Sequence, residues 1–174
     1  MDDHDYRGRD LTSALLARAD LSRKDLSKSD LSGADLDSAD LTEAILEDAV
    51  LIGTVLSDAK LTGANLTRAD LYMIFGYRAD FERAVLKDAH LLGANLIEAN
   101  LTGADLTGAK LGRSKIATPT RLQGATLVDA NVSQADFTDA LYDSHTRFPA
   151  HFLPEEHGMV AVKDETNGSS SSAW

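Results

Sequence analysis

Residues 30–44 read Asp30-Leu31-Ser32-Gly33-Ala34-Asp35-Leu36-Asp37-Ser38-Ala39-Asp40-Leu41-Thr42-Glu43-Ala44. Leucine returns at every fifth position, alanine stands two residues before each leucine, and aspartate lies between them. The spacing runs from Tyr6 to Tyr142 if one extra residue is allowed between Ile116 and Leu122. Of the 28 positions placed this way, 21 are leucine, and alanine fills 20 of the 27 preceding inward positions, so the period belongs to nearly the whole chain. The other seven positions hold Tyr6, Gly76, Phe81, Ile116, Val132, Phe137 and Tyr142.

A period of five fits neither a helix nor a straight strand. Five helical residues advance about 500°, which would spread the leucines around the axis. On a strand, five steps send successive leucines to opposite faces. A chain that turns a corner every five residues keeps alanine and leucine inside and the other residues outside.

Glycine usage supports these corners. At some repeats the residue two after the inward position is glycine, where a type II turn requires positive φ. These glycines are Gly8, Gly33, Gly53, Gly63, Gly93, Gly103, Gly108 and Gly124. Other corners carry Arg, Asp, Ser or Glu at this place, and we expect them to use a different turn type.

Residues 30–44 and 94–110 resemble the pentapeptide-repeat family, whose motif is A(D/N)LXX. The resemblance covers about residues 6–143. It implies an all-β fold, a right-handed quadrilateral parallel β-helix with four pentapeptides per coil. Twenty-eight repeats would form about seven coils, and at ~4.8 Å per coil the rod would be roughly 34 Å long. In this fold the outward Asp and Asn side chains can bond the backbone of the following turn.

Two places depart from the repeat. Gly76 stands where leucine is expected and Ile74 where alanine is expected, which exchanges volumes across one corner and predicts a local bulge within continuous coils. Between Ile116 and Leu122 there are six steps in place of five. This predicts a one-residue bulge at residues 117–121, with Pro119 facing solvent because it cannot donate to a ladder.

Charge and composition exclude several functions. The net charge is −11, which argues against direct nucleic-acid or membrane binding. Residues 1–60 carry a net −7, residues 61–120 a net +1 and residues 121–174 a net −5. No stretch is long and apolar enough to span a membrane, no signal-peptide pattern is present, and there is no cysteine. A cytoplasmic location is expected.

Stacking residues twenty apart predicts an apolar outer patch on the uncharged middle coils. It is formed by Ile52, Val55, Tyr72, Met73, Phe75, Tyr77 and Leu92. One interpretation is a docking or self-association surface on a monomer or weak dimer. The other is that apolar ladders merely stabilise the parallel coils.

The C-terminal residues predict a covered end. We expect a repeat domain at 1–143, a cap at 144–162 and a flexible, low-complexity tail at 163–174. Pro154, two glutamates and Gly158 predict a short helical turn, and Phe148, Phe152 and Leu153 are expected to cover the last coil.

The sequence offers little chemistry. His145, His151 and His157 are spaced too widely for a typical zinc site, so capping or solvated histidines are preferred, and no metal or cofactor is expected. There is no phosphate loop or nucleophile elbow, and a packed interior leaves no substrate pocket, so an enzyme is not expected. The preferred function is a noncatalytic protein-interaction scaffold of unknown partner. The alternative, implied by some family members, is a DNA mimic that binds DNA gyrase and confers resistance to quinolones or a toxin.

Overall fold

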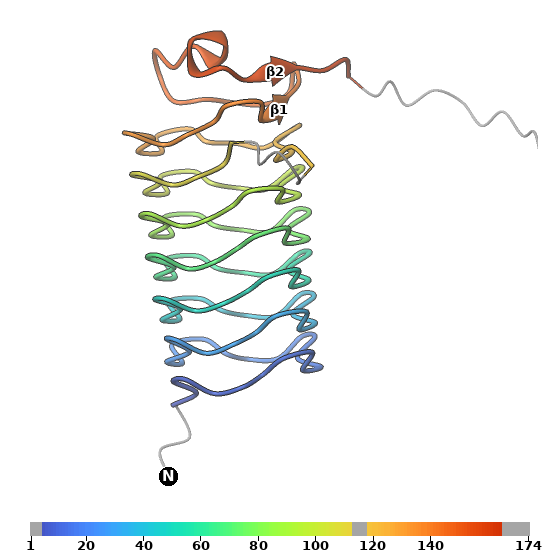
Figure 1. Cartoon of the computed structure of the whole chain (residues 1–174), viewed down its shortest axis with the longest axis vertical. Helices are drawn as coiled ribbons and strands as arrows, with labels where there is room; N and C mark the ends of the chain where they lie inside the picture. Colours follow the sequence, from blue (N-terminus) through green and yellow to red (C-terminus); the bar gives the residue numbers. More distant parts are fainter. Residues whose placement is uncertain (1–4, 113–117, 165–174) are drawn as a thin grey trace, which may run out of the picture.

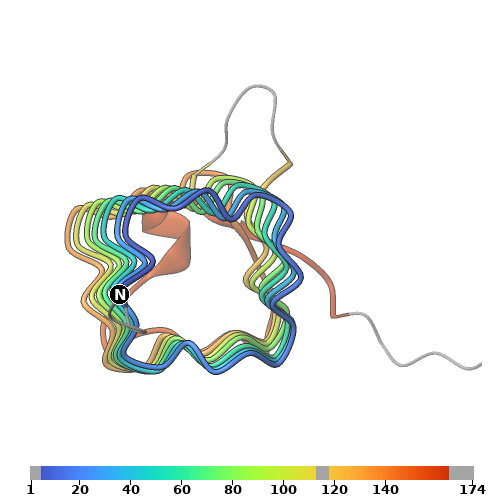
Figure 2. The ribbon, with the colours of Figure 1, turned by 90° about the horizontal axis from the view of Figure 1, so that it is seen from below.

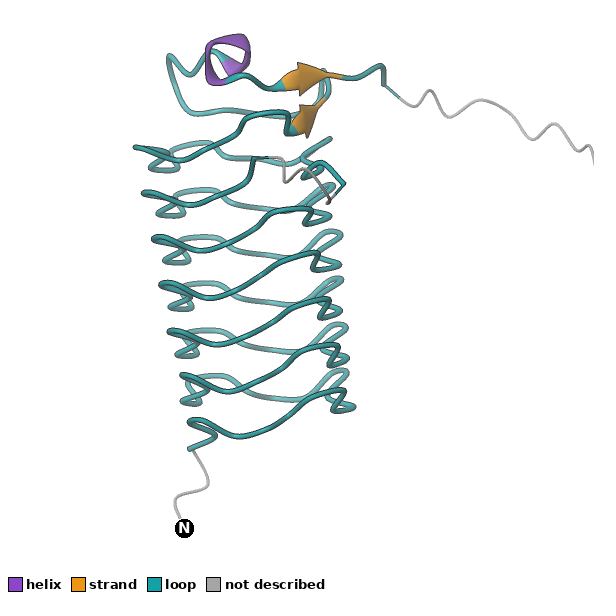
Figure 3. Ribbon diagram, in the orientation of Figure 1, coloured by secondary structure: helices purple, strands orange, loops and turns teal. Residues whose placement is uncertain are grey.

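The computed structural model describes residues 5–112 and 118–164. The described chain forms a rod of stacked coils that climbs from the N-terminal to the C-terminal end (Figure 1). Seen along the rod axis, each coil has a four-sided outline (Figure 2). Most of the described part of the chain is made of turns and single-residue bridges, and its regular strands and short helix all lie near the C-terminal end of that part (Figure 3).

Parallel bridges join residues twenty apart along the rod. Asp35 pairs with Val55, Val55 with Phe75, and Phe75 with Asn95. Because each repeat has five residues, a spacing of twenty residues between bridged positions means four repeats per coil. Within each coil the leucine N–H donates to the coil above, as from Leu31 N to the Val50 carbonyl oxygen at 2.7 Å. Backbone groups that the turns leave free are thus satisfied between coils.

The interior is filled by the alanine and leucine side chains, as the period predicts. From Leu26 to Leu127 the leucines of the repeat are fully buried, and Phe81 substitutes for one of them at the same burial. The innermost side chains pack over neighbouring coils, which is how a solenoid builds one continuous core from small units. At the N-terminal end Leu11 and Leu16 are only partly buried.

The described corners from Tyr6 to Phe137 share one conformation, which corrects the expectation of two turn types. The residue two after the leucine has positive φ whether it is glycine, as at Gly63 (67°), or not, as at Arg18 (62°) and Asp58 (55°). Each corner closes with a bond such as Ala34 N to the Leu31 carbonyl oxygen at 2.9 Å. The ladder between coils fixes the backbone so firmly that ordinary residues accept a left-handed conformation.

The outward Asp or Asn before each leucine stabilises the turn that follows. Its Oδ1 accepts the backbone N–H two residues later, at 2.9 Å from Thr42 N to Asp40 and at 3.1 Å from Thr67 N to Asn65. The same bond recurs on every side of the rod. This is the local competition for backbone donors expected of these side chains.

The exchange of volumes at Gly76 is confirmed, but the predicted bulge is wrong. Ile74 is 1% exposed, and its Cδ1 lies 3.5 Å from the place where a Cβ on Gly76 would stand. Gly76 N still donates to the Asn95 carbonyl oxygen at 2.8 Å, and Phe75 keeps its bridge to Asn95. The larger isoleucine reaches across the corner, so the backbone has no reason to deform.

The second departure is longer than the sequence suggests. Asn95 bridges Arg121, so the spacing between these bridged positions is 26 residues (121 − 95), six more than the usual twenty. The predicted one-residue bulge is therefore wrong: six residues are inserted between Leu111 and Leu122. Ile116, taken as a repeat position, lies outside the described residues, whereas Pro119 is described and half-buried.

Thr120 restores hydrogen bonding between coils at the point where the repeat resumes after the inserted residues. Its side chain is fully buried at an alanine position. Its Oγ1 accepts from Gly93 N at 3.2 Å and donates to the Leu91 carbonyl oxygen at 2.9 Å. The hydroxyl oxygen thus accepts from the Gly93 N–H. At other corners the equivalent N–H, such as that of Gly53, donates to a carbonyl oxygen of the coil above.

The C-terminal end carries the three regular elements. Strand β1 (Leu141–Tyr142) pairs in parallel with β2 (Val160–Ala161), so one side of the rod gains a further rung. Between them lies the 3₁₀ helix η1 (Pro154–His157), which ends at Gly158 with φ 70°. The expected short helical turn is present at Pro154.

Aromatic residues pack over the last coil as expected, but Met159 takes the covering position that was predicted for Leu153. Phe137 and Phe152 meet edge to face at 5.4 Å, and Phe152 stacks on Phe148 at 5.0 Å. Leu153 is 52% exposed and does not cover the coil, while Met159 is 6% exposed and does. Leu153 precedes η1, whose first residue is proline, and its extended backbone directs it outward. Of the expected tail at 163–174, residues 165–174 lie outside the described part.

Candidate interaction surface

Five of the seven predicted patch residues stand in two stacked columns of the rod. Val55 and Phe75 occupy bridged positions on consecutive coils. The neighbouring corner stacks Ile52, Tyr72 and Leu92, because Gly53 N donates to the Tyr72 carbonyl oxygen and Met73 N to that of Leu92. We call Ile52, Val55, Tyr72, Met73, Phe75, Tyr77 and Leu92 the apolar patch.

The most exposed members are large. Phe75 is 52% exposed, and Ile52 and Met73 are each 40% exposed. Val55, Tyr72, Tyr77 and Leu92 are partly buried between them. Isolated exposed apolar side chains are common on proteins, but a contiguous set over three coils is characteristic of contact surfaces.

The patch replaces residues that stabilise the rod. Val55 and Phe75 stand where Asp35 and Asn95, one coil away, accept the turn N–H at 3.0 and 3.4 Å. A valine or phenylalanine side chain has no acceptor, so Ser57 and Tyr77 lose this partner. If the patch only stabilises the rod, apolar contact between coils must outweigh the loss of these turn hydrogen bonds. If the patch binds a partner, the lost stability is compensated by a gain in binding.

A polar rim borders the patch at the corner that follows it. Arg78 pairs with Asp58 at 2.6 Å and lies over the ring of Tyr77 at 5.1 Å. The Tyr77 hydroxyl donates to Glu98 at 3.1 Å. The hydrogen bond to Asp58, together with its charge, holds the pKa of Arg78 above its ordinary value. The rim therefore combines one ion pair, Arg78 with Asp58, and one carboxylate, Glu98, held by a neutral hydroxyl.

Among the described repeats of the rod, two exposed large apolar residues lie outside the patch that the sequence predicted. Leu15 is 88% exposed and shares the bridged column of Val55 and Phe75, with Asp35 between. Ile45 is 40% exposed but bridges Asp25 and Asn65, which places it in a different column. Leu15 could have been included from the sequence, since it also stands where the repeat usually has Asp.

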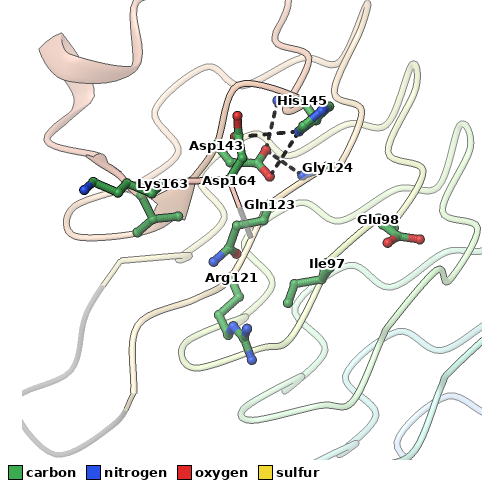
Figure 4. A pocket seen from close by; sticks show the side chains of 10 residues that line it. Ile97, Glu98, Arg121, Gln123, Gly124, Asp143, His145, Lys163 and Asp164 are labelled. Carbon is green, nitrogen blue, oxygen red and sulfur yellow. Dashed lines mark hydrogen bonds and ion pairs between the residues drawn. The ribbon is translucent and has the colours of Figure 1, made fainter. Parts of the chain in front are cut away.

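A second feature, which the sequence did not predict, is an open groove at the C-terminal corner of the rod. We call it the C-terminal groove; its volume is about 670 Å³. Its walls combine side chains from several coils and from the residues after β2: Ile97, Arg121, Gln123, Asp143, Val162 and Lys163. In Figure 4, Gln123 lies between Arg121 and the group formed by Asp143, His145 and Asp164.

The Asp143, His145 and Asp164 group is held by internal bonds. Their ligand-type atoms lie within 4.8 Å of one another. However, Asp143 accepts from Gly124 N at 2.9 Å and Thr146 N at 3.0 Å, and Asp164 accepts from Ser144. Burial raises the pKa of Asp143, but these hydrogen bonds outweigh it and hold the pKa below its ordinary value. The carboxylates are thus explained as turn acceptors.

The three histidines are not gathered in one place. The His145 Nδ1 lies 3.6 Å from Asp143, and His157 stacks on Phe152 at 4.2 Å between ring centres. His151 is exposed and has positive φ. One histidine therefore borders the groove, and another belongs to the aromatic cover of the last coil.

A family profile for pentapeptide repeats, in eight copies, matches residues 10–48, 34–71 and 77–115. The chain belongs to the pentapeptide-repeat family. No curated protein matches the chain. Within the described residues no helix of this pentapeptide-repeat protein has the length and apolar character needed to cross a bilayer.

Solved structures of other pentapeptide-repeat proteins resemble this one. HetL from the cyanobacterium Nostoc sp. strain PCC 7120, involved in heterocyst differentiation regulation, is 36% identical with a TM-score of 0.76. The match covers 82% of this chain and 59% of HetL, so the chain spans only about three fifths of that protein's length. Such relatives imply a right-handed quadrilateral β-helix here.

Two more distant structures were also found. Rfr23 from the cyanobacterium Cyanothece 51142 is 24% identical, with a TM-score of 0.42 and coverage of 83% of this chain and 91% of its own. QnrB1, a plasmid-mediated fluoroquinolone resistance protein, is 18% identical, with a TM-score of 0.49 and coverage of 92% and 86%. We draw no functional argument from these two.

Proposed function

We propose that the protein is a noncatalytic interaction scaffold and that a partner protein binds the apolar patch. The observation that carries the proposal is the replacement of turn-stabilising Asp or Asn by Val55 and Phe75 on consecutive coils. The rod interior is filled by leucine and alanine, so recognition falls to the outer surface. An aromatic and aliphatic centre with a polar rim is typical of such contacts.

The repeat itself supplies a clean test. Phe75→Asp and Val55→Asp remove apolar surface and restore the acceptor that other repeats use, so the rod should be no less stable than the parent. We expect these variants to lose partners that the parent retains in affinity capture from the source cell, with binding falling at least tenfold. Ile45→Asp makes the same chemical change on another side of the rod and serves as the matched control.

Two results would contradict this proposal. One is equal capture of the same partners by Phe75→Asp and the parent. The other is a loss of stability in Phe75→Asp without loss of binding, which would assign the patch to packing between coils.

A second candidate is gyrase binding by DNA mimicry, favoured by the acidic residues of the first coils. Residues 1–60 carry a net −7, and the described aspartates among them, from Asp5 on, face outward around the rod. Ion pairs such as Arg68 with Asp48 at 2.8 Å weaken this acidic surface. A supercoiling assay tests this candidate: neither inhibition of gyrase nor protection against a quinolone at high protein concentration would count against it.

A further inference from the structure

We propose that the apolar patch packs against the same face of a second copy of this chain, with the two rods side by side and antiparallel. This pairing depends on the proposed function, because it names the partner that the patch binds. Three observations support it: the order of residues in the column that contains Phe75, two charges in that column, and the area of this side of the rod.

The column of bridged residues through Phe75 has complementary side chains at equal distances before and after it. Seven consecutive coils contribute to the column, in the order Leu15, Asp35, Val55, Phe75, Asn95, Arg121 and Leu141. Asp35 lies two coils before Phe75, and Arg121 lies two coils after it. Leu15 and Leu141 lie three coils away on either side. The column therefore reads as matched pairs about its centre.

A two-fold axis that crosses the rod at Phe75 brings these pairs together. In a symmetric dimer one surface serves on both copies, so each contact occurs twice. Turning the second rod end for end sets its Phe75 against Phe75 and its Arg121 against Asp35. Leu15, which is 88% exposed, gains the leucine side chain of Leu141 as a neighbour.

The neighbouring column is complementary to itself about the same axis. Tyr72 stands on the coil of Phe75, and Ile52 and Leu92 lie one coil to either side of Tyr72. The rotation sets Tyr72 against its own copy and Ile52 against Leu92. The centre of the interface then holds aromatic rings from both copies, which is where binding energy concentrates in protein contacts.

The charges of Asp35 and Arg121 are not used within the rod. Asp35 Oδ1 accepts from Asp37 N at 3.0 Å, and its carboxylate forms no ion pair with another described residue. The guanidinium of Arg121 likewise has no hydrogen bond or ion pair with the described part of the chain. The three carboxylates that line the C-terminal groove beside Arg121 are held by other hydrogen bonds. Both charges are therefore free to meet a second copy.

These two charges fix the direction and the register of the pairing. Parallel rods would set Asp35 against Asp35 and Arg121 against Arg121, and like charges at an interface are strongly unfavourable. A shift of the antiparallel rods by one coil would set Arg121 against Leu15 or Val55, depending on its direction. The centred antiparallel arrangement is thus the one that pairs both charges.

The area of this side of the rod is that of a weak dimer. Seven coils at about 4.8 Å are about 29 Å long. One side of the four-sided coil holds five residues and is at most about 17 Å wide (Figure 2). Each copy thus contributes about 500 Å², and the total of about 1,000 Å² is near the lower limit for a specific interface. We expect a dissociation constant in the micromolar range.

Sedimentation equilibrium of the full chain, from micromolar to hundreds of micromolar, measures the dimer directly. Asp35→Arg sets two cations together, and Arg121→Asp sets two carboxylates together, so each should weaken dimerisation about tenfold or more. The combined variant Asp35→Arg/Arg121→Asp exchanges two residues within one column and should restore the parent value. Asp40→Arg makes the same change in another column and should leave dimerisation unchanged. Circular dichroism verifies that each variant remains folded.

Crosslinking tests the antiparallel order, since the chain has no cysteine of its own. A disulfide requires Cα atoms within about 7 Å of each other. An oxidised mixture of Asp35→Cys and Arg121→Cys should form a crosslinked dimer, because these positions face each other. Either variant alone should form little, because its two cysteines would lie about 19 Å apart, four coils along the rod.

Three results would overturn the pairing: a parent that stays monomeric at hundreds of micromolar, a dimer that the two charge reversals leave unchanged, and crosslinking of Asp35→Cys with itself. Phe75→Asp separates this pairing from the proposed function. It should abolish the dimer, because two carboxylates would meet at the axis. If Phe75→Asp still dimerises but loses a different captured protein, the pairing is wrong and the proposed function stands. If it still dimerises and captures the same proteins as the parent, both are wrong.

Discussion

Ile74 and Gly76 share the volume that an alanine and a leucine fill at the other corners of the rod. The Cδ1 of Ile74 lies 3.5 Å from the position of a Cβ on Gly76, and Leu96 Cδ2 lies 3.1 Å from it. The two residues therefore form one packing unit, and changes at either should depend on the other.

We predict that Gly76→Leu alone destabilises the rod by about 1–3 kcal/mol through overpacking. Ile74→Ala alone should cost about 2–5 kcal/mol because it leaves a cavity. The double variant restores the usual repeat and should be more stable than either single variant. Urea unfolding of the four proteins measures this coupling, and purely additive effects would contradict a shared volume.

The buried hydroxyl of Thr120 should be essential where the inserted residues rejoin the coil. Thr120→Val keeps the shape but leaves the Gly93 N–H without its partner. The expected cost is about 1–3 kcal/mol, seen as a lower Tm. Thr118→Val, at an exposed position of the same segment, is the control and should change Tm little. Equal Tm values for the two variants would argue against the role given to Thr120.

Acid should weaken the rod through the aspartates that accept turn N–H groups. Hydrogen bonds from the Thr42 side chain and backbone hold the pKa of Asp40 below its ordinary value. A lowered folded pKa means that this stabilisation is present above the unfolded pKa of about 3.9 and is lost as the pH falls through the folded value. We predict a falling Tm below about pH 4.

Asp40→Asn separates titration from the hydrogen bond. Asn65 and Asn100 show that an amide accepts the same turn bond. The variant should be close to the parent at low pH and less stable near neutral pH, where the ionised carboxylate makes the stronger bond. A constant Tm difference across the whole pH range would contradict the prediction.

The left-handed corners offer a route to a more stable rod. Gln134 has φ 60°, a conformation that glycine accepts without steric cost. Gln134→Gly should stabilise by up to about 1 kcal/mol, or leave stability unchanged if the entropy of glycine in the unfolded chain offsets the gain. Gly124→Ala, where φ is 70° and a Cβ would stand 3.3 Å from Glu98 Cγ, should destabilise. Chemical denaturation compares the two, and a stabilising Gly124→Ala would refute the strain argument.

The fold could be predicted from the sequence because its period has few structural solutions. Alanine and leucine two apart, followed by a corner, define the inside of every coil before any long-range contact is considered. The corner conformation could not be predicted in the same way. Arg18 or Asp58 would avoid positive φ in isolation, and only the ladder between coils makes it acceptable.

The insertion and the groove show two other limits. Ile116 stands five residues after Leu111, so the sequence alone assigned it to a repeat position, whereas the bridge from Asn95 to Arg121 shows that the ladder resumes at residue 121. The groove is built from Ile97, Gln123 and Asp143, which belong to different coils, and from Val162, which follows β2. No local pattern joins such residues; their meeting depends on the six-residue shift in register. The apolar patch lies below that shift, and its seven members were therefore found from the period of twenty.

Because Thr120 satisfies the coil by itself, the length of the segment before it is uncoupled from the stacking of the rod. The corner after Leu111 is thus a suitable insertion site. A foreign peptide or small module inserted there would leave the register of the coils on either side unchanged.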